Sequence, residues 1–368
     1  MSVRIDITGL TAERIHFAPS PLAELGAALH ALAEPAHHPG VQGWTTSVAA
    51  CLDPCLADRM CEADFLWRTT FSDVFTPSAG VPGRHTLPGA TLAEDLDLLD
   101  KLSDEQFVDA ALEFTCQSEY ARRDVTRLDD PRTRERALEL AAARGSHQMR
   151  FTQRLLEDPP AIRAWFRELM QDCDEAFFSD VWGRVRPQLA ADARLKTDLL
   201  RRKGVPDALC AVSGSVSLDD TGRSVVVDKV SVGHTATGSG DLVLIPTGLG
   251  RPHLWVLHRK DWQPLITYPI SAPGLTAPTS VEQLTLRLSA LAHPVRMRLC
   301  RHLARGSYTT GELADAHGMT APEISRHLSL LKKAGLITTR RHGRYARHQL
   351  DLGVVSRLGG DFIEGVLR

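Results

Sequence analysis

Basic side chains are concentrated near the C-terminal end of this sequence. Residues 282–368 contain 14 Lys and Arg against 7 Asp and Glu, a net charge of +7. The remaining residues hold 29 basic and 38 acidic side chains, a net of −9, so the overall charge of −2 conceals the asymmetry. A basic module on an acidic body is typical of proteins that bind a polyanion such as DNA. A basic helical surface without a partner is the alternative.

Three arginines fall at the tip of a predicted β-hairpin. Residues 337–341 favour one strand, His342 and Gly343 a tight turn, and residues 344–348 a returning strand. The hairpin therefore presents Arg340, Arg341 and Arg344 together. Guanidinium groups on a projecting ribbon suit phosphate contacts or a narrow minor groove. An ordinary solvated hairpin is the alternative.

The helix before this hairpin has clear start and stop signals. Thr320 and Glu323 have the spacing of a capping box, and Pro322 falls in the first turn, where its missing N–H costs nothing. Gly335 supplies the left-handed residue that ends the helix. The buried face is predicted to consist of Ile324, Leu328 and Leu331.

A shorter helix precedes it. Thr309 and Glu312 form a second capping-box pattern, and Gly318 is placed to end that helix. Two helices joined by a short turn containing glycine are a helix-turn-helix, whose second helix enters the major groove of DNA. Upstream, a leucine stripe from residue 284 to 303 is interrupted at Pro294, which predicts two further helices meeting near His293.

The helix and the hairpin together predict a site for double-stranded DNA. Base recognition is expected from the N-terminal half of the helix, with Glu323, Ser325 and Arg326 as the best candidates, although Arg326 could instead clamp a phosphate. Binding should weaken steeply with salt. The full predicted set is Thr320, Ala321, Glu323, Ser325, Arg326, His327, Ser329, Lys332, Arg340, Arg341 and Arg344.

These motifs resemble the ArsR-type winged helix family of bacterial regulators. The similarity covers about seventy residues and lies in five stretches at the family's spacing: 291–296, 312–314, 325–328, 331–337 and 341–345. It implies a transcription regulator, usually a repressor, that binds an inverted-repeat operator as a homodimer. It also implies dimer contacts from the module's first and last helices, residues 281–293 and 352–367.

The sequence departs from the metal-sensing members of that family. Those members carry two cysteines on the helix that ends in Glu-Leu, and the matching positions here are Thr309 and Gly311. A second family site uses Asp and His on the last helix, but no His follows Asp351. We therefore expect no metal sensing at either position. Cys300 and His302 are expected to be packing or surface residues.

The chain is predicted to be α+β but mainly α. We expect a large helical N-terminal domain over residues 1–203, with a small β subdomain over 204–270 as part of the same domain. A segment rich in Pro, Gly, Ser and Thr, 271–280, has the composition of a linker. Residues 281–368 complete the chain as a winged helix-turn-helix with a C-terminal dimerisation helix.

Several elements of the N-terminal region are predicted by local signals. Alternation over residues 3–7 predicts a strand, Ser20 and Pro21 begin a helix, and Ser103 and Gln106 have capping-box spacing. Long helices are expected over 132–156 and 161–202. Short β segments are expected at 211–212, 216–218, 225–227, 242–245 and 254–257.

The beginning of the chain also resembles known proteins. Residues 3–32, with the turn at 17–22 that leads into a helix, are similar to domains of unknown function found ahead of ArsR-type modules in some actinobacterial regulators. That resemblance names no ligand. The N-terminal region is expected either to sense a signal, such as an unidentified small-molecule effector, or to extend the dimer.

A group of cysteines offers a competing site. Cys51, Cys55 and Cys61, with His37 and His38 upstream, could hold a soft metal or sense oxidants. The sequence contains no C-x-x-C pair, which well-defined metal sites usually show. We therefore interpret the three cysteines as small buried apolar residues and predict no metal site and no cofactor.

Other classes of function find less support. The sequence has no phosphate-binding loop, H-E-x-x-H or G-x-S-x-G motif, so we predict no enzyme. No apolar run approaches the roughly 20 residues that cross a bilayer. Asp6 falls where a signal peptide would carry an apolar stretch, so we predict a cytoplasmic protein. The alternatives are an N-terminal small-molecule-binding or enzymatic module tethered to a DNA-binding domain, and a protein-interaction scaffold. The +7 charge argues against the scaffold.

Overall fold

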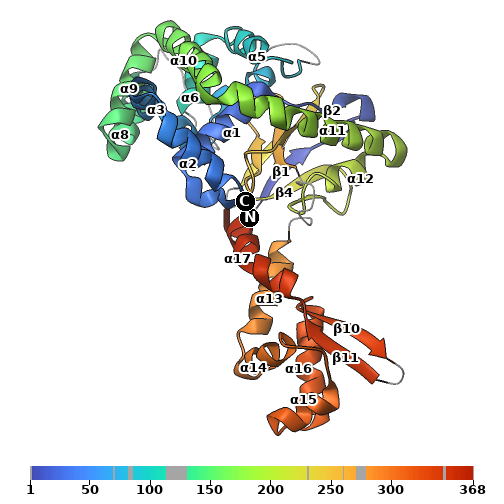
Figure 1. Cartoon of the computed structure of the whole chain (residues 1–368). Coiled ribbons are helices and arrows are strands. Elements are labelled where there is room, and N and C mark those ends of the chain that lie inside the picture. Colours follow the sequence, from blue (N-terminus) through green and yellow to red (C-terminus); the bar gives the residue numbers. More distant parts are fainter. Residues whose placement is uncertain are drawn as a thin grey trace. The chain divides into compact units, whose positions relative to one another are not determined.

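The computed structural model describes residues 2–68, 71–81, 86–112, 131–229, 232–259, 261–270, 279–342 and 345–367. The chain divides into two compact units, Met1–Thr276 and Ala277–Leu367. Most of the predicted linker, residues 271–278, lies outside the described residues. The predicted fold class is confirmed: a large helical region with small sheets, and a C-terminal winged helix-turn-helix (Figure 1).

Helices make up most of the N-terminal unit. Within the described part of the chain, no helix is long and apolar enough to cross a membrane. Helix α1, Pro21–Ala33, begins as predicted, because the Ser20 hydroxyl accepts a hydrogen bond from the Ala23 amide at 3.0 Å.

The other α-helices are α2 (Gln42–Cys51), α3 (Pro54–Ala63), α4 (Phe65–Arg68), α5 (Leu92–Leu99), α6 (Asp104–Leu112), α8 (Pro131–Arg144), α9 (Ser146–Glu157), α10 (Pro159–Cys173), α11 (Ser179–Lys203) and α12 (Val205–Cys210). Short 3₁₀ turns are η1 (Ala12–Arg14), η2 (Pro35–His37), η3 (Pro39–Val41), η4 (Asp73–Phe75) and η5 (Pro77–Ala79).

One predicted long helix is broken, and another is continuous but contains a π-helical turn. The helix expected over residues 132–156 is broken into α8 and α9 at Gly145, whose φ of 137° is a backbone conformation that side-chain-bearing residues rarely adopt. The helix expected over residues 161–202 contains a π-helical turn, Asp174–Phe178, between α10 and α11. The capping box at Ser103 is confirmed, since Ser103 and Gln106 exchange hydrogen bonds of 2.9 and 3.1 Å at the start of α6.

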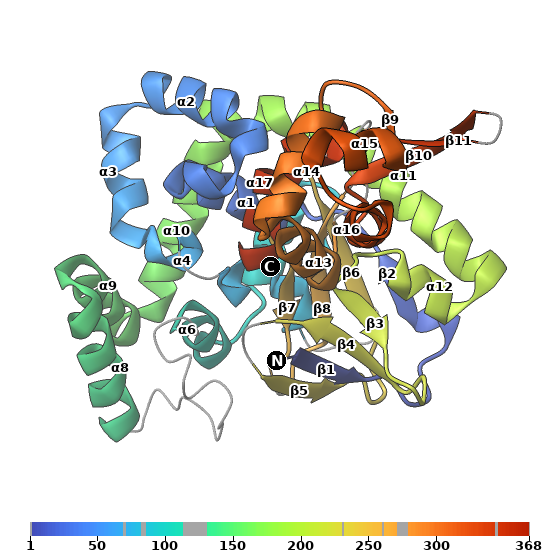
Figure 2. The same cartoon turned by 90° about the horizontal axis from the view of Figure 1, so that it is seen from below.

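The strands of the N-terminal unit form two four-stranded sheets (Figure 2). One has the order β3-β4-β1-β5, and the other has the order β2-β6-β8-β7. The strands are β1 (Ser2–Asp6), β2 (Ile15–Phe17), β3 (Val216–Leu218), β4 (Ser224–Asp228), β5 (Gly233–Ala236), β6 (Leu242–Thr247), β7 (Trp255–Leu257) and β8 (Leu265–Pro269). Because β1 and β2 supply a strand to each sheet, the first residues of the chain are built into its β-rich part. Strands β2, β5 and β8 were not predicted, and the β segment expected at residues 211–212 is instead a turn after α12.

Helix α1 connects the helices to the second sheet. Eleven of its residues are buried, including a carboxylate, Glu24. That carboxylate accepts hydrogen bonds from the amides of Gly248 and Leu249, at 3.0 and 2.9 Å, just after β6. Burial raises the pKa of Glu24. The unit therefore holds α1 against the end of β6 by a buried polar contact as well as by apolar packing.

The C-terminal unit contains the predicted helices and hairpin. A third sheet has the order β10-β11-β9, and the two-residue strand β9 was not predicted. The apolar core of the C-terminal unit includes Leu299, Leu303, Leu313, Ile324 and Leu331. The elements are α13 (Val281–Leu291), α14 (Pro294–Leu303), β9 (Tyr308–Thr309), α15 (Thr310–His317), α16 (Ala321–Lys333), β10 (Ile337–His342), β11 (Tyr345–Leu350) and α17 (Leu352–Leu367).

Candidate nucleic-acid interface

Helix α16 is fixed at its first turn by the predicted capping box. The Glu323 carboxylate accepts hydrogen bonds from the Thr320 amide at 2.9 Å and from its hydroxyl at 2.7 Å. These bonds lower the pKa of Glu323, so its carboxylate is ionised at neutral pH. Since this carboxylate holds the start of the helix, its predicted role in reading bases competes with a positioning role.

The rest of α16 divides into two faces, as predicted. Ile324, Leu328 and Leu331 are buried in the core of the unit. The opposite face is solvent-exposed and carries the polar side chains. Its exposed members among the predicted site residues are Thr320, Ala321, Ser325, Arg326, Ser329 and Lys332.

His327 differs from its neighbours on the helix. Its ring is half-buried, with its centroid 5.0 Å from the ring centroid of His293. Burial, together with the nearby His293, lowers the pKa of His327. Its Nδ1 atom is buried without a hydrogen-bond partner among the described residues. His327 is therefore part of the packing between α16 and the start of α14, and less of its ring is available to DNA than sequence analysis assumed.

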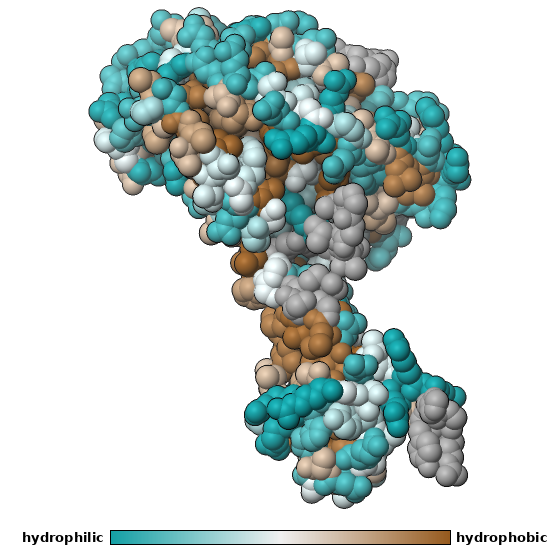
Figure 3. Space-filling model, viewed as in Figure 1, coloured by the Kyte–Doolittle hydropathy of each residue, from teal (hydrophilic) through white to brown (hydrophobic). Residues whose placement is uncertain are grey.

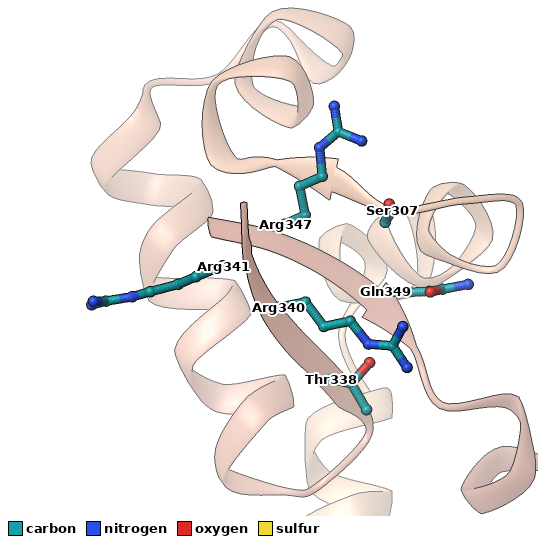
Figure 4. Close-up of a pocket in the computed structure, with 6 residues that line it drawn as sticks. All are labelled: Ser307, Thr338, Arg340, Arg341, Arg347 and Gln349. Carbon is teal, nitrogen blue, oxygen red and sulfur yellow. The ribbon is translucent and has the colours of Figure 1, made fainter. Parts of the chain in front are cut away.

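The hairpin of β10 and β11 groups arginines by its register. Arg340 lies directly opposite Arg347, and Thr338 lies opposite Gln349, so these four side chains share one face of the ribbon. Together with Ser307 they line a shallow hollow (Figure 4). Figure 4 also shows Arg341 pointing away from Arg340, because neighbouring residues on a strand alternate between faces. Basic groups thus occupy both sides of the hairpin.

The exposed cations of this surface form no ion pair with an acidic side chain in the described part of the chain, although Arg326 and Arg347 help to lower the pKa of Glu323 and Glu312, respectively. Among the described residues, no ion pair involves Arg326, Lys332, Arg340, Arg341 or Arg347. Elsewhere in the same unit, Arg287 pairs with Asp361 at 2.6 Å, and Arg296 donates to backbone carbonyls. We call the five unpaired cations the basic surface. Its charges are available to a polyanion rather than being neutralised within the fold.

The structure brings most of the predicted site residues into one module. Arg344 lies outside the described residues. The turn predicted at His342 and Gly343 is wrong, because His342 belongs to β10 and lies opposite Tyr345. The observed register sets Arg347 across from Arg340, so Arg347, Thr338 and Gln349 were absent from the predicted site.

The positions that hold metals in some ArsR-type proteins have structural roles in this chain. Thr309 caps α15 together with Glu312. Asp351 accepts a hydrogen bond from the Val354 amide at 3.1 Å, near the start of α17. Cys300 is buried, and burial raises the pKa of its thiol. His302 packs on Tyr308, with ring centroids 5.1 Å apart.

The cysteine cluster weighed from the sequence does not form a buried group. Cys51, Cys55 and Cys61 are exposed free thiols. This corrects their interpretation as buried apolar residues, since α2 and α3 present them to solvent. In the part of the chain that the structure describes, no set of metal-ligating side chains includes them.

Comparison with known families covers both units. A profile described as a family of unknown function (DUF5937) matches residues 1–274, about three quarters of the chain. The chain belongs to DUF5937. In this DUF5937 protein, a helix-turn-helix profile matches residues 291–340, which contain α14 to α16 and most of β10. The C-terminal module is therefore a winged helix-turn-helix of the ArsR type.

Curated relatives resemble only the helix-turn-helix region of the DUF5937 protein. A biofilm growth-associated repressor of Agrobacterium fabrum is 33% identical over 76 residues, 21% of this chain and 65% of the relative. The regulator CmtR of Mycobacterium tuberculosis is 36% identical over 78 residues, 21% of this chain and 66% of the relative. A probable mercury resistance operon repressor of Streptomyces lividans is 36% identical over 61 residues, 17% of this chain and 49% of the relative. The chain thus spans between about half and two thirds of these relatives.

A solved structure is similar over the same share of the DUF5937 protein. It is described as a possible transcriptional regulator for arsenical resistance, and it is 36% identical. The match covers 21% of this chain and 79% of that one, with a TM-score of 0.20.

Proposed function

We propose that this chain is a transcription repressor that binds double-stranded operator DNA as a homodimer in the cytoplasm. The observation that carries the proposal is the basic surface, a set of exposed cations on α16 and the hairpin that form no ion pairs among the described residues. A recognition helix and a basic wing on one small module are the arrangement by which winged helix proteins approach DNA. Neutralising phosphates with these cations would supply most of the affinity.

The two parts of the surface have different expected roles. Ser325, Arg326 and Ser329 lie on the exposed face of α16 and are suited to contact base edges in the major groove. Lys332 and the wing arginines, including Arg344, are suited to phosphates, which carry no sequence information directly. Thr320 and Glu323 would position the helix rather than read bases.

Dimerisation would use the first and last helices of the module. Helices α13 and α17 pack closely, since a Cβ added at Gly365 would lie 2.9 Å from Leu284 Cδ2, and Arg287 pairs with Asp361 between them. Both helices also leave large apolar side chains exposed, a surface visible as brown in the C-terminal unit in Figure 3. These side chains are Val281, Leu286, Leu288, Leu352, Phe362 and Val366.

The experiment begins by sequencing genomic fragments that co-purify with the full chain. Recovery of an inverted repeat supplies the operator for titration by fluorescence anisotropy. The double variant Arg340→Ala with Arg347→Ala should weaken binding to all duplexes about equally, and it should reduce the slope of log K against log salt by about 2. Arg326→Ala should instead change the preference among operator variants, provided that Arg326 reads bases.

Arg184→Ala with Arg186→Ala is the matched control, because it also removes two exposed positive charges, here from α11 in the other unit. Its binding should equal that of the wild type. A purified chain that binds no genomic duplex at low salt would contradict the proposal. An unchanged affinity in the double variant would contradict the role of the wing.

The N-terminal unit would then serve to sense a signal or to extend the dimer. It is the part of the chain that the DUF5937 profile matches, and the curated relatives resemble only the helix-turn-helix region. We propose a non-enzymatic role for it, because the sequence contains none of the catalytic motifs sought above. Control of DNA binding by an effector would appear as a coupling free energy between the two sites.

A further inference from the structure

Four histidines converge in the interior of the N-terminal unit. His30 lies on α1, His37 ends η2, His38 follows it, and His253 lies between β6 and β7. The ring centroids of these four histidines are 4.7 to 6.4 Å apart. Nitrogen atoms of His30, His37 and His253 all lie within 4.8 Å of one another. The fold thus brings together rings that are separated by more than 200 residues of sequence.

Backbone carbonyls orient two of these rings. Nδ1 of His30 lies 2.5 Å from the carbonyl oxygen of Trp67, and Nδ1 of His38 lies 2.6 Å from that of Arg251. A carbonyl can only accept, so each Nδ1 carries the proton and donates it. Each Nε2 is consequently the unprotonated nitrogen of a neutral ring. Histidines that bind metals characteristically donate their other N–H to such an acceptor.

Two of the rings are hydrogen-bonded to each other. Nε2 of His30 lies 3.0 Å from Nε2 of His253, which can donate a hydrogen bond to it. Two other ring nitrogens have no such partner in the described part of the chain. Nδ1 of His37 and Nε2 of His38 are buried without a hydrogen-bond partner among the described residues. Buried polar atoms normally have partners, and two such atoms in one cluster point to a ligand that accepts lone pairs.

The surroundings of the cluster fit a transition-metal ion. His30, His38 and His253 are at most 9% exposed. No thiol or carboxylate belongs to the group, which disfavours both soft monovalent metals and Ca²⁺ or Mg²⁺.

We propose that His30, His37 and His253 bind one divalent transition-metal ion of the Zn²⁺, Co²⁺ or Ni²⁺ class, with His38 beside them. Three imidazoles leave a fourth position for water or for a neighbouring ring. Bonds of about 2.0–2.1 Å place ligand nitrogens roughly 3.3 Å apart, so the separation of up to 4.8 Å would close by about 1.5 Å on binding. Sequence analysis predicted no metal site, because nothing in the sequence links His253 to the α1 region.

An aromatic side chain offers a direct readout. The ring of Trp255 stacks on His253, with centroids 5.5 Å apart, and it contacts His30 edge-on at 6.1 Å. A paramagnetic ion such as Co²⁺ at the cluster should therefore quench the fluorescence of Trp255. Comparison with Trp255→Phe separates this signal from that of the other five tryptophans.

The test uses the full chain, freed of any affinity tag and stripped with a chelator. Titration with Co²⁺ should give visible absorption that saturates at one ion per chain, and Zn²⁺ should displace it. His37→Gln and His253→Gln should each weaken Co²⁺ binding by at least about tenfold. His37 is only half-buried, so its variant remains decisive even where the His253 variant fails to fold.

Two further variants make the result specific to the cluster. His234→Gln changes an exposed histidine on β5 and should bind Co²⁺ like the wild type. Replacing Cys51, Cys55 and Cys61 together by Ser should also leave binding unchanged. Absence of stoichiometric binding would overturn the proposal, as would binding that survives both cluster variants or depends on the thiols. The readout involves no DNA, so its outcome is independent of the proposed repressor function.

Discussion

The buried histidines of the N-terminal unit make its stability depend on pH. Burial lowers the pKa of His38 from 6.5 to about 4. Between these values the unfolded chain binds a proton that the folded chain does not bind. The contribution of His38 to the free energy of unfolding is therefore complete above pH 6.5 and is lost as the pH falls toward 4. Asp95 acts in the opposite direction, because burial raises its pKa from 3.8 to about 6.

His38→Gln isolates this contribution. In the metal-free chain, the free energy of unfolding of the wild type should fall relative to that of the variant by at most about 3 kcal/mol between pH 7 and pH 4. Urea unfolding followed by tryptophan fluorescence is suited to the measurement, because all six tryptophans lie in the N-terminal unit. Asp95 is present in both proteins, so its effect on the free energy of unfolding cancels in the comparison. Parallel pH curves for the two proteins would contradict the assignment.

At the scale of elements, the helix-turn-helix depends on how its helices begin. Helices α15 and α16 both start with a threonine and a glutamate three residues apart that satisfy each other's backbone amides. Such a box fixes the first turn, and replacing the capping residue by Ala typically costs about 1 kcal/mol. The first turn of α16 also leads directly into the side chains proposed to reach DNA, so fraying there would affect binding as well as stability.

Thr320→Ala should therefore lower the free energy of local opening of α16 by about 1 kcal/mol. Fluorescence cannot report this change, since the C-terminal unit has no tryptophan. Hydrogen exchange of peptides from residues 321–333, read by mass spectrometry, provides the measurement. Thr320→Ser keeps the hydroxyl and should exchange like the wild type. Equal protection in the Ala variant would mean that the box contributes nothing to α16.

Local signals explain which elements sequence analysis could predict. The capping boxes at Thr309 and Thr320 involve residues three apart, and the break at Pro294 follows from the ring itself, so these elements were predicted with their boundaries. The hairpin was predicted as well, because its two strands are joined by a short turn. The same local signals identified α16 and the wing as the candidate site.

Elements whose pairing partners lie far away in the sequence were not predicted. Strand β8 lies beside β6 in a parallel pairing and is almost wholly buried, so it lacks the alternation of a half-exposed strand. Gly145 ends α8 although glycine alone does not distinguish a helix break from a tolerated helical residue. The histidine cluster is the extreme case, since His253 joins α1 only through the tertiary fold.

On the scale of the whole molecule, the proposed repressor function depends on how the C-terminal module dimerises. An inverted-repeat operator requires two copies related by a twofold axis, and such an interface uses the same patch on both copies. The exposed apolar side chains of α13 and α17 offer that patch: Phe362 is 47% exposed, Val366 58% and Leu352 56%. Apolar groups so exposed in neighbouring helices favour burial against a second copy.

Phe362→Glu should convert a dimer into a monomer, because it would place a charge within this apolar patch. Sedimentation velocity at micromolar concentration should show the wild type as a dimer and the variant as a monomer. The matched control is Leu195→Glu, an exposed leucine of α11 in the other unit, which should remain dimeric. Because the Phe362 variant no longer dimerises, its affinity for the operator should fall. The contacts between one module and one half-site should stay intact. A variant that remains dimeric would exclude α17 from the interface, and a monomeric wild type that still binds its operator tightly would remove the need for a symmetric reader.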